Sequence, residues 1–532
     1  MTAIATRRWV FPANAVSVAA VLIGIVVLWD VVSRTILAGQ YVLAGPVDIV
    51  ARLWTDAPLY GRALEITLYE AALGFLFGNT AAIVLAAFVA LIPASERTVQ
   101  GLALVVFCLP LVATGPVLRV LFGPGDGPQI TLAALAVYYT TFVPLVVGLR
   151  AIPDSWSDLV ASYGRGRWQT LITVRARASV PYLVAGLKVA APAAVLGAMV
   201  GEFTGAERGM GVLVIQAIRS LDVEATWAIA TLATAASIAA YLLAVLAGRL
   251  LSPGSPPMLF SARPADAAQS FARRFSVGVL AILGTTVLIL AIWQGAMAWF
   301  DLSPFFAKRP GDIFAYLVTA PNAVAHRAEV FGALGETLAV TIPGYFAGLA
   351  VGVLMACLFE LFPLARQTMT PIAIALRSVP IITTAPLLIM AFGRGAAGLV
   401  VIVAVMTFFP TLVACAEGLR RVPGQVTDFF DSFAAGRVRT LFLARLPAML
   451  PAFFAAARIA VPTAVLAATV AEWLSTGTGI GNLMALTYST SAYNILWSCV
   501  VVLTFVSVIG YALVAIVERL VLLSFAPEQV AR

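Results

Sequence analysis

The chain has 532 residues, of which 61% are hydrophobic and only 11% are charged, and its mean hydropathy is +1.00. These values exclude a soluble globular protein and indicate a polytopic membrane protein, because a soluble surface requires many more charged side chains. The formal net charge of +8 does not indicate nucleic-acid binding, since arginines concentrated on one side of a membrane account for it. The single histidine and four isolated cysteines argue against a metal site or a cofactor.

Apolar runs, taken in chain order, predict an all-α protein with about twelve membrane spans, six in each half of the chain. Spans of the first half are expected near 14–33, 65–92, 99–122, 129–148, 180–204 and 224–249. Spans of the second half are expected near 275–299, 335–362, 369–392, 397–417, 449–473 and 494–517. Helices are favoured over strands because the runs are long, continuous and rich in alanine and leucine.

The composition divides the chain into two transmembrane domains and a connection. We expect the first domain over residues 1–250, a linker over 251–274 and the second domain over 275–532. The linker is rich in serine, proline and glycine and has no long apolar run, which is typical of an extended connection. The run near 14–33 resembles a signal peptide, but it is longer than a typical h-region and lacks a clear cleavage site, so we expect a retained helix.

Arginine-rich segments fall on alternate loops, and this alternation predicts the sidedness of the chain. With the N-terminus inside, the segments containing Arg97, Arg150, Arg274 and Arg420 also lie inside, whereas the opposite loops carry a thinner and mixed set of charges. The assignment is self-consistent with six spans per half. It places both chain termini in the cytoplasm.

The same pattern of glycine, proline and charged residues occurs twice, at an offset of 270 residues (148 to 418). Matched pairs include Gly74 and Gly344, Gly78 and Gly348, Pro110 and Pro380, Asp158 and Asp428, Arg167 and Arg437, Pro181 and Pro451, Glu202 and Glu472, and Gly211 and Gly481. A constant offset over so many positions indicates a tandem duplication. The chain is therefore a covalent pair of similar halves.

Each half has one basic polar segment, which lies between its fourth and fifth spans. In the first half the segment runs from Ser155 through Asp158 and Gly164 to Arg167. Serine and aspartate suit a helix start and glycine permits a sharp turn, so we predict a short helix, a turn and a second helix bearing arginines. An ordinary basic loop remains the alternative for one copy, but its duplication at matching positions favours a function.

The segment from Tyr163 to Gln169 approaches the pattern Leu-Gly-Ala-Ser-x-Trp-Gln and resembles the EAA loop of membrane subunits of bacterial ABC importers. The stretch from Arg377 to Gly393, and Ala471-Glu472 followed by Gly479-Ile480-Gly481, resemble further signatures of one group of these permeases. That group serves nitrate, sulfonates, taurine and thiamine-precursor pyrimidines. The resemblance covers nearly all of the chain outside the linker and the tails.

The resemblance implies two type I importer transmembrane domains, fused in tandem and lying in the bacterial plasma (inner) membrane. It implies that ATP-binding cassette subunits, expected as a homodimer, dock on the two loops, and that an extracytoplasmic substrate-binding protein delivers a small polar or anionic solute. The implied coupling residues are Asp158, Gly164, Gly166, Arg167, Trp168, Asp428, Gly436 and Arg437. The only lysines, Lys188 and Lys308, lie outside any Gly-Lys-Ser/Thr phosphate loop, so we expect no ATP hydrolysis and no catalytic residue in this chain.

Departures from the EAA pattern distinguish the two loops. Asp158 and Asp428 stand where the family prefers glutamate, which keeps the charge. Gly164 is replaced by Ala434 in the second copy. We therefore expect two loops that are not equivalent.

Charged residues within the predicted spans are candidates for the solute pathway, because ionisable groups at membrane depth tend to face a cavity or a partner. The candidates are Glu202, Glu472, Arg119, Arg377 and Arg394. For the two glutamates, the alternative is a structural carboxylate that accepts hydrogen bonds from the glycine-rich turn that follows it. Lys188 and Arg458 are expected to snorkel toward the cytoplasmic interface, with a role in the solute pathway as the alternative.

Two other classes of membrane protein are weighed against an importer subunit. An ion-driven secondary transporter with two parallel six-helix repeats would also contain a duplication, but it would more often show broken helices than paired basic loops. A membrane enzyme would need a cluster of catalytic side chains, and the sequence has none with suitable spacing.

Overall fold

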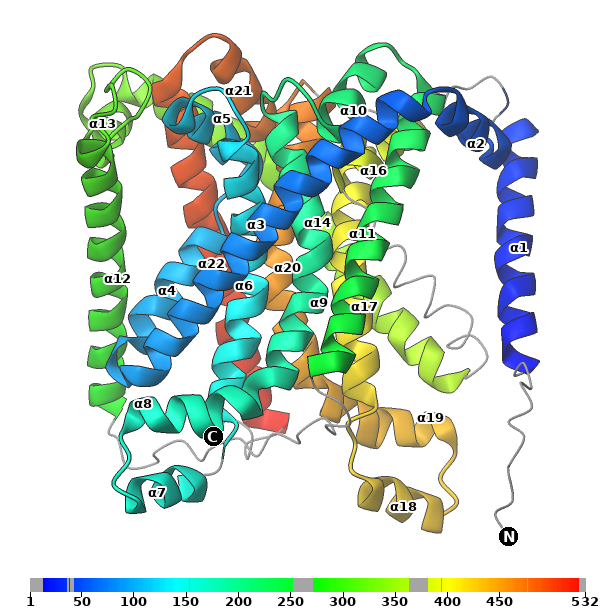
Figure 1. The fold of residues 1–532 in the computed structure, drawn as a ribbon, viewed down its shortest axis with the longest axis vertical. Helices are drawn as coiled ribbons and strands as arrows, with labels where there is room; N and C mark the ends of the chain where they lie inside the picture. Colours follow the sequence, from blue (N-terminus) through cyan, green and yellow to red (C-terminus); the bar gives the residue numbers. More distant parts are fainter. Residues whose placement is uncertain are drawn as a thin grey trace.

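The computed structural model describes residues 13–35, 38, 43–152, 154–251, 271–362, 381–393, 395–475 and 477–525. These residues are almost entirely helical and contain no β-strand, which confirms the all-α prediction for them. The long helices stand side by side, and short helices cover both ends of the bundle (Figure 1).

The described part of the first half contains eleven α-helices. They are α1 (Ala13–Arg34), α2 (Pro46–Thr55), α3 (Ala57–Leu91), α4 (Glu96–Phe107), α5 (Leu111–Phe122), α6 (Gly127–Arg150), α7 (Asp154–Ser162), α8 (Arg167–Thr170), α9 (Ala176–Phe203), α10 (Met210–Arg219) and α11 (Val223–Leu251). A 3₁₀ turn, η1 (Pro93–Ser95), precedes α4, and a π-helical turn, η2 (Leu171–Arg175), joins α8 to α9.

The second half repeats this order. Its described helices are α12 (Phe271–Trp299), α13 (Pro310–Phe314), α14 (Ala323–Leu361), α16 (Ile381–Phe392), α17 (Ala396–Leu419), α18 (Gly424–Ser432), α19 (Arg437–Thr440), α20 (Leu446–Ser475), α21 (Gly479–Ser489) and α22 (Tyr493–Phe525). Two π-helical turns, η3 (Ala315–Thr319) and η4 (Leu441–Arg445), complete it. Of the predicted linker, residues 252–270 lie outside the described residues.

Within the described ranges, nine helices are long and apolar enough to cross a membrane, or ten if one bent pair counts as a single span. The prediction of about twelve spans is therefore met only in part. The nine do not include α1, which occupies the span expected near 14–33. The span expected near 369–392 lies partly outside the described residues.

The span predicted near 99–122 is not one continuous helix but a bent pair of helices. α4 and α5 meet at a break over Cys108–Pro110 and are bent by 87°. Pro110 causes the break, because proline has no N–H to donate and disfavours helical geometry in the residue before it. α5 begins directly after Pro110, whose extended backbone (φ −70°, ψ 107°) turns the chain.

Each half has the same packed core of three long helices. In the first half α3 packs on α6 and α6 packs on α9, and in the second half α14 packs on α17 and α17 packs on α20. Buried alanines on α9 and α20, including Ala194 and Ala464, let the backbones approach closely. The two halves that repeat in sequence therefore also repeat the order in which their long helices pack.

The halves are interleaved rather than merely adjacent. α12, the first helix of the second half, packs against α4 of the first half at one edge of the bundle (Figure 1). Val470 of α20 joins the core of the first half, and Ala113 of α5 joins a core of the second half. The two bundles therefore share one continuous interface.

Candidate functional site

The two basic segments fold into matching projections at one end of the bundle. We call residues 154–175 and 424–445 the arginine knobs, and the end that carries them the knob end (Figure 1). Each knob consists of a short helix (α7 or α18), a tight turn and a second short helix (α8 or α19) that continues through a π-helical turn into α9 or α20. This confirms the predicted helix–turn–helix form.

All eight residues predicted to couple the chain to a partner are exposed on the knobs. They are Asp158, Gly164, Gly166, Arg167, Trp168, Asp428, Gly436 and Arg437. Asp158 and Asp428 lie in the middle of α7 and α18, not at the helix starts where a cap would lie. The glycines shape the turns, whereas Arg167 and Arg437 begin the second helices.

The turn of each knob has the same backbone geometry although its sequence differs. Gly164 has φ +72° and Ala434 has φ +49°, so both residues adopt the left-handed conformation. Their amides donate hydrogen bonds to Ala161 O at 2.8 Å and to Asp431 O at 2.9 Å. Alanine is disfavoured in this conformation because its Cβ approaches the following carbonyl oxygen. The two knobs therefore keep one shape, and the second holds it against local strain.

Each knob exposes large apolar side chains at the same five positions. The matched pairs are Trp156 and Val426, Leu159 and Phe429, Tyr163 and Phe433, Trp168 and Val438, and Ile172 and Phe442. The most exposed pair is Tyr163 and Phe433, at 76% and 72% of their full surface. Clusters of exposed apolar side chains on a projection mark interaction surfaces. The sequence patterns that predicted the knobs had not identified these pairs.

An ion pair fastens the second knob to the bundle. Arg445 in η4 pairs with Glu360 near the end of α14. The matched positions of the first half are Arg175 and Ala90, so this pair has no counterpart there. Next to the first knob, Arg150 at the end of α6 pairs with Glu96 at the start of α4.

Glu202 and Glu472 form the same buried structure in the two halves, at the end of the bundle opposite the knobs. Glu202 accepts hydrogen bonds from the Thr67 hydroxyl at 2.5 Å and from the Gly211 amide at 2.6 Å. Thr67 in turn accepts a hydrogen bond from the Met210 amide at 3.0 Å. We call this arrangement the carboxylate clasp, because it joins α3, α9 and the start of α10.

The second carboxylate clasp repeats the first residue by residue. Glu472 accepts hydrogen bonds from the Thr337 hydroxyl and the Gly481 amide, both at 2.9 Å, and Thr337 accepts one from the Ile480 amide at 2.9 Å. Glu202 and Glu472 are 0% and 2% exposed. Their geometry matches the alternative of a structural carboxylate that bonds the glycine-rich turn. Sequence reasoning missed Thr67 and Thr337, although the 270-residue offset relates them.

Arg119 lies in a polar pocket of the first half, at the end opposite the knobs. The pocket has a volume of about 560 Å³, and the Arg119 guanidinium donates a hydrogen bond to Gly125 O at 3.2 Å within it. Its floor contains Glu70 and Gln129, which are 1% and 3% exposed. The positions matching Arg119, Glu70 and Gln129 are Ile389, Val340 and Leu399, so these three polar side chains are not repeated in the second half.

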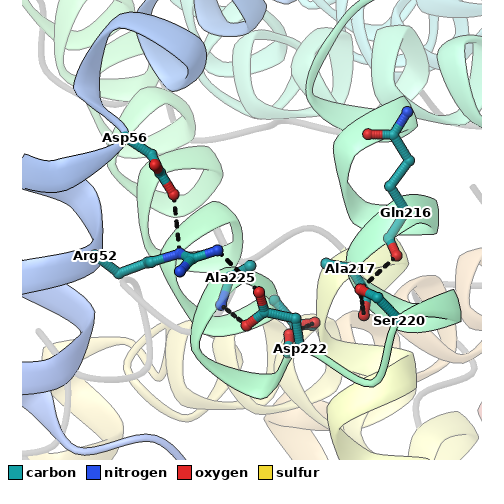
Figure 2. Close-up of polar contacts among 8 residues, drawn as sticks. Arg52, Asp56, Gln216, Ala217, Ser220, Asp222 and Ala225 are labelled. Atoms are coloured by element: carbon teal, nitrogen blue, oxygen red, sulfur yellow. Dashed lines mark hydrogen bonds and ion pairs between the residues drawn. The ribbon is translucent and has the colours of Figure 1, made fainter.

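The first half also has an ion-pair network at this end, shown in Figure 2. Arg52 of α2 lies 2.9 Å from the carboxylate of Asp56 and 2.9 Å from that of Asp222. Asp222 also accepts a hydrogen bond from the Ala225 amide at 2.9 Å and so caps α11. The position matching Asp222 in the second half is Ala492, which has no carboxylate. The Arg52–Asp222 pair that ties α2 to α11 therefore has no counterpart at that position.

A large cavity lies between the two halves. Its volume is about 1240 Å³, and it is lined by α5, α6, α9 and α11 of the first half and by α16, α17 and α20 of the second. Lys188, for which snorkelling toward the cytoplasmic interface stays a prediction, is one of the residues that line this cavity. Two of the predicted pathway residues, Arg377 and Arg394, lie outside the described residues. In the part of the chain that the structure describes, no group of three or more His, Cys, Asp or Glu side chains is placed to hold a metal ion.

These features define a membrane transport permease built from two matched bundles with paired knobs. The chain belongs to the family described as "Binding-protein-dependent transport system inner membrane component", whose model matches residues 78–255 and again residues 348–522. The two matches begin 270 residues apart, which agrees with the repeat. The chain is accordingly a multi-pass transport protein of the bacterial plasma membrane, and its family consists of permeases rather than enzymes.

Curated relatives correspond to one half of the chain. The formylaminopyrimidine transport permease protein ThiX of Halalkalibacterium halodurans is 26% identical over 236 residues, which are 44% of this chain and 92% of that protein. A probable ABC transporter permease protein of Haemophilus influenzae is 26% identical over 217 residues, 41% of this chain and 89% of that protein. The taurine transport system permease protein TauC of Escherichia coli is 24% identical over 200 residues, 37% and 73%. The chain thus has the form of two such permeases joined.

Proposed function

We propose that this chain is the complete translocation unit of an ATP-driven importer. Two halves, related by duplication, supply both knobs and both sides of the solute pathway. The knob end faces the cytoplasm together with both termini, in agreement with the arginine distribution. The solute is anionic and passes through the cavity between the halves.

The single observation that carries this proposal is the pair of knobs with apolar side chains exposed at matching positions. Burying Leu159 and Phe429 in a groove of a partner would remove large apolar surfaces from water, and each buried side chain of this size stabilises a complex by about 1.5–3 kcal/mol. Two similar knobs fit two copies of one partner. We assign that partner as a homodimer of ATP-binding cassette subunits.

ATP hydrolysis belongs to those separate subunits in this proposal. Neither lysine of the chain lies in a Gly-Lys-Ser/Thr loop. Each knob continues as one helix through η2 or η4 into α9 or α20, which line the cavity. A movement of the knobs is therefore transmitted directly to the walls of the pathway.

The opposite end of the bundle receives a substrate-binding protein in this proposal. The family description names a binding-protein-dependent system. The two halves differ there, because the first half has the polar pocket around Arg119 and the Arg52 network. We assign the carboxylate clasps as braces that hold α10 and α21 in place at this end, not as contacts for the solute.

The knobs are tested by charge substitutions at matched apolar positions. The double variant Leu159→Asp with Phe429→Asp is expected to abolish co-purification of the ATP-binding subunit with the chain and to abolish ATP-dependent uptake. The control is Ser162→Asp with Ser432→Asp, which adds the same charges to α7 and α18 without removing apolar surface. Intact ATPase binding in the first variant contradicts the proposal, and so does uptake driven by an ion gradient without ATP, which would indicate a secondary transporter.

A further inference from the structure

The cavity between the halves is lined symmetrically by α9 and α20. Matched pairs from the two helices contribute to its wall: Val189 and Ile459, Pro192 and Pro462, and Leu196 and Leu466. A wall made of matched residues from both halves lies at the pseudo-symmetry axis of the molecule. Any solute that passes between the halves meets this surface.

The chemistry of the wall is almost wholly apolar. Among its described residues the only charged one is Lys188. The threonines of the wall donate their hydroxyl hydrogens to carbonyl oxygens of their own helices, as Thr140 does to Val137 O at 2.7 Å and Thr463 to Ile459 O at 3.0 Å. These threonines therefore have no hydroxyl hydrogen left to donate to a small hydrated solute. A volume of about 1240 Å³ is at or above the size of cavities that enclose drug-sized organic molecules.

Lys188 has no ion-pair partner among the residues that the structure describes, although its counterpart has one. Arg458, at the matching position, lies 3.1 Å from the Glu518 carboxylate and 5.8 Å from the centre of the Tyr511 ring. The positive charge of the second half is thus compensated by the protein, and that of the first half is directed to the cavity. Lys188 is half-buried, and a charged side chain within a membrane-spanning helix that lines a cavity is a candidate functional site.

We propose that the cavity binds an organic anion with a bulky apolar body, and that its acidic group pairs with the Lys188 ammonium. The apolar body replaces water along the walls, and the single acidic group compensates the single ammonium. A small inorganic anion such as nitrate would lose its hydration on entry and gain one ion pair, which does not offset the cost of desolvation. The inference rests on the proposed pathway between the halves and names the class of solute for it.

Binding of 2-naphthalenesulfonate to the purified full chain in lipid nanodiscs tests this inference, with calorimetry as the measurement. Binding of neutral 2-naphthol measures the contribution of the apolar walls without an ion pair. Binding of nitrate measures the contribution of the ion pair without an apolar body. Lys188→Met is expected to weaken sulfonate binding by about 30-fold or more, the effect of truncating one partner of a desolvated ion pair. The same variant leaves 2-naphthol binding unchanged, and Lys188→Arg retains sulfonate binding. Lys308→Met, which removes the only other lysine, is the matched control.

A second variant keeps the inference testable if Lys188→Met does not fold. Ala193→Trp fills the cavity from α9 and is expected to weaken both sulfonate and 2-naphthol binding. Equal sulfonate affinity in the wild type and Lys188→Met overturns the inference, as does displacement of the sulfonate by nitrate at comparable concentration. These measurements need neither ATP nor a partner protein, so their failure is distinguishable from a failure of ATPase docking.

Discussion

Thr67 donates its hydroxyl hydrogen to the buried carboxylate of Glu202 at 2.5 Å and accepts one from the amide of Met210. One side chain thus links α3, α9 and α10, and Thr337 does the same in the second half. Because both bonds are buried, removing the hydroxyl leaves the Met210 amide without this acceptor and removes one hydrogen bond from the Glu202 carboxylate, which keeps the bond from the Gly211 amide.

Thr67→Val is expected to lower the stability of the chain by about 2–3 kcal/mol, since a hydrogen bond to a charged group is lost and a buried amide is left unsatisfied. Thr337→Val should have a similar effect. Thermal unfolding in lipid nanodiscs measures both. Thr80→Val is the control, because Thr80 is exposed on the same helix and bonds only to Leu76 O. An unchanged unfolding temperature for both clasp variants would show that the clasps do not brace the bundle.

Glycine is required beside each clasp. A Cβ atom at Gly209 would lie 2.2 Å from the Glu202 side chain, and Gly209 has φ +117°, which L side chains rarely adopt. Gly209→Ala is therefore expected to prevent accumulation of folded protein in membranes, and Gly479→Ala likewise. Gly61→Ala, at an open position in α3, should be neutral or stabilising by up to about 1 kcal/mol. Normal yields of Gly209→Ala would contradict the packing seen around Glu202.

Substitutions at the turns of the two knobs are expected to change the stability of the knobs in opposite directions. Ala434→Gly relieves the left-handed strain and is expected to stabilise the second knob by about 1 kcal/mol, whereas Gly164→Ala destabilises the first by about as much. A Cβ atom added at Gly164 would have no other atom within 4 Å, so the expected loss comes from the backbone conformation alone. Amide hydrogen exchange of α7 and α18 measures the local effect. Changes of the same sign in both variants would rule out the shared turn geometry.

Substitutions at Arg52 and Asp222 are expected to lower the stability of the chain by unequal amounts. Arg52→Met removes partly exposed ion pairs, which contribute about 1 kcal/mol or less. Asp222→Ala also removes the cap of α11 and is expected to cost about 1 kcal/mol more. A double-mutant cycle on thermal stability separates the two contributions. Equal losses in the two single variants would show that the cap adds nothing to the ion pair.

Much of this molecule could be predicted from the sequence because the duplication constrains it. Gly211 follows Glu202 at the same distance as Gly481 follows Glu472, and this repeat indicated that each carboxylate bonds the glycine-rich turn after it. The knobs were predicted for the same reason, since polar residues repeated inside an apolar chain need a common cause. The exposed apolar pairs of the knobs could not be predicted in this way. Leu159 and Phe429, for example, are different residue types, and what they share is that both side chains are exposed.

Features that depend on contacts between the halves could not be predicted from apolar runs. The α4–α5 break lies inside one continuous apolar stretch, and only Pro110 hints at it. That Lys188 lines the cavity between the halves could not be predicted either, because hydropathy gives the depth of a residue but not the direction that it faces. The ion pair of Arg458 with Glu518 joins α20 to α22, and no local pattern relates the two.

The packing of α12 against α4 has a consequence for how the molecule is made and how it survives damage. During synthesis the surface of α4 around Gly101 stays uncovered until Thr285 and its neighbours on α12 enter the membrane beside it. The first half is therefore not a finished unit when its own last helix has inserted. Conversely, the two fragments would stay associated after a protease cut within residues 252–270, because the helix contacts between the halves, and not the connecting segment, hold them together.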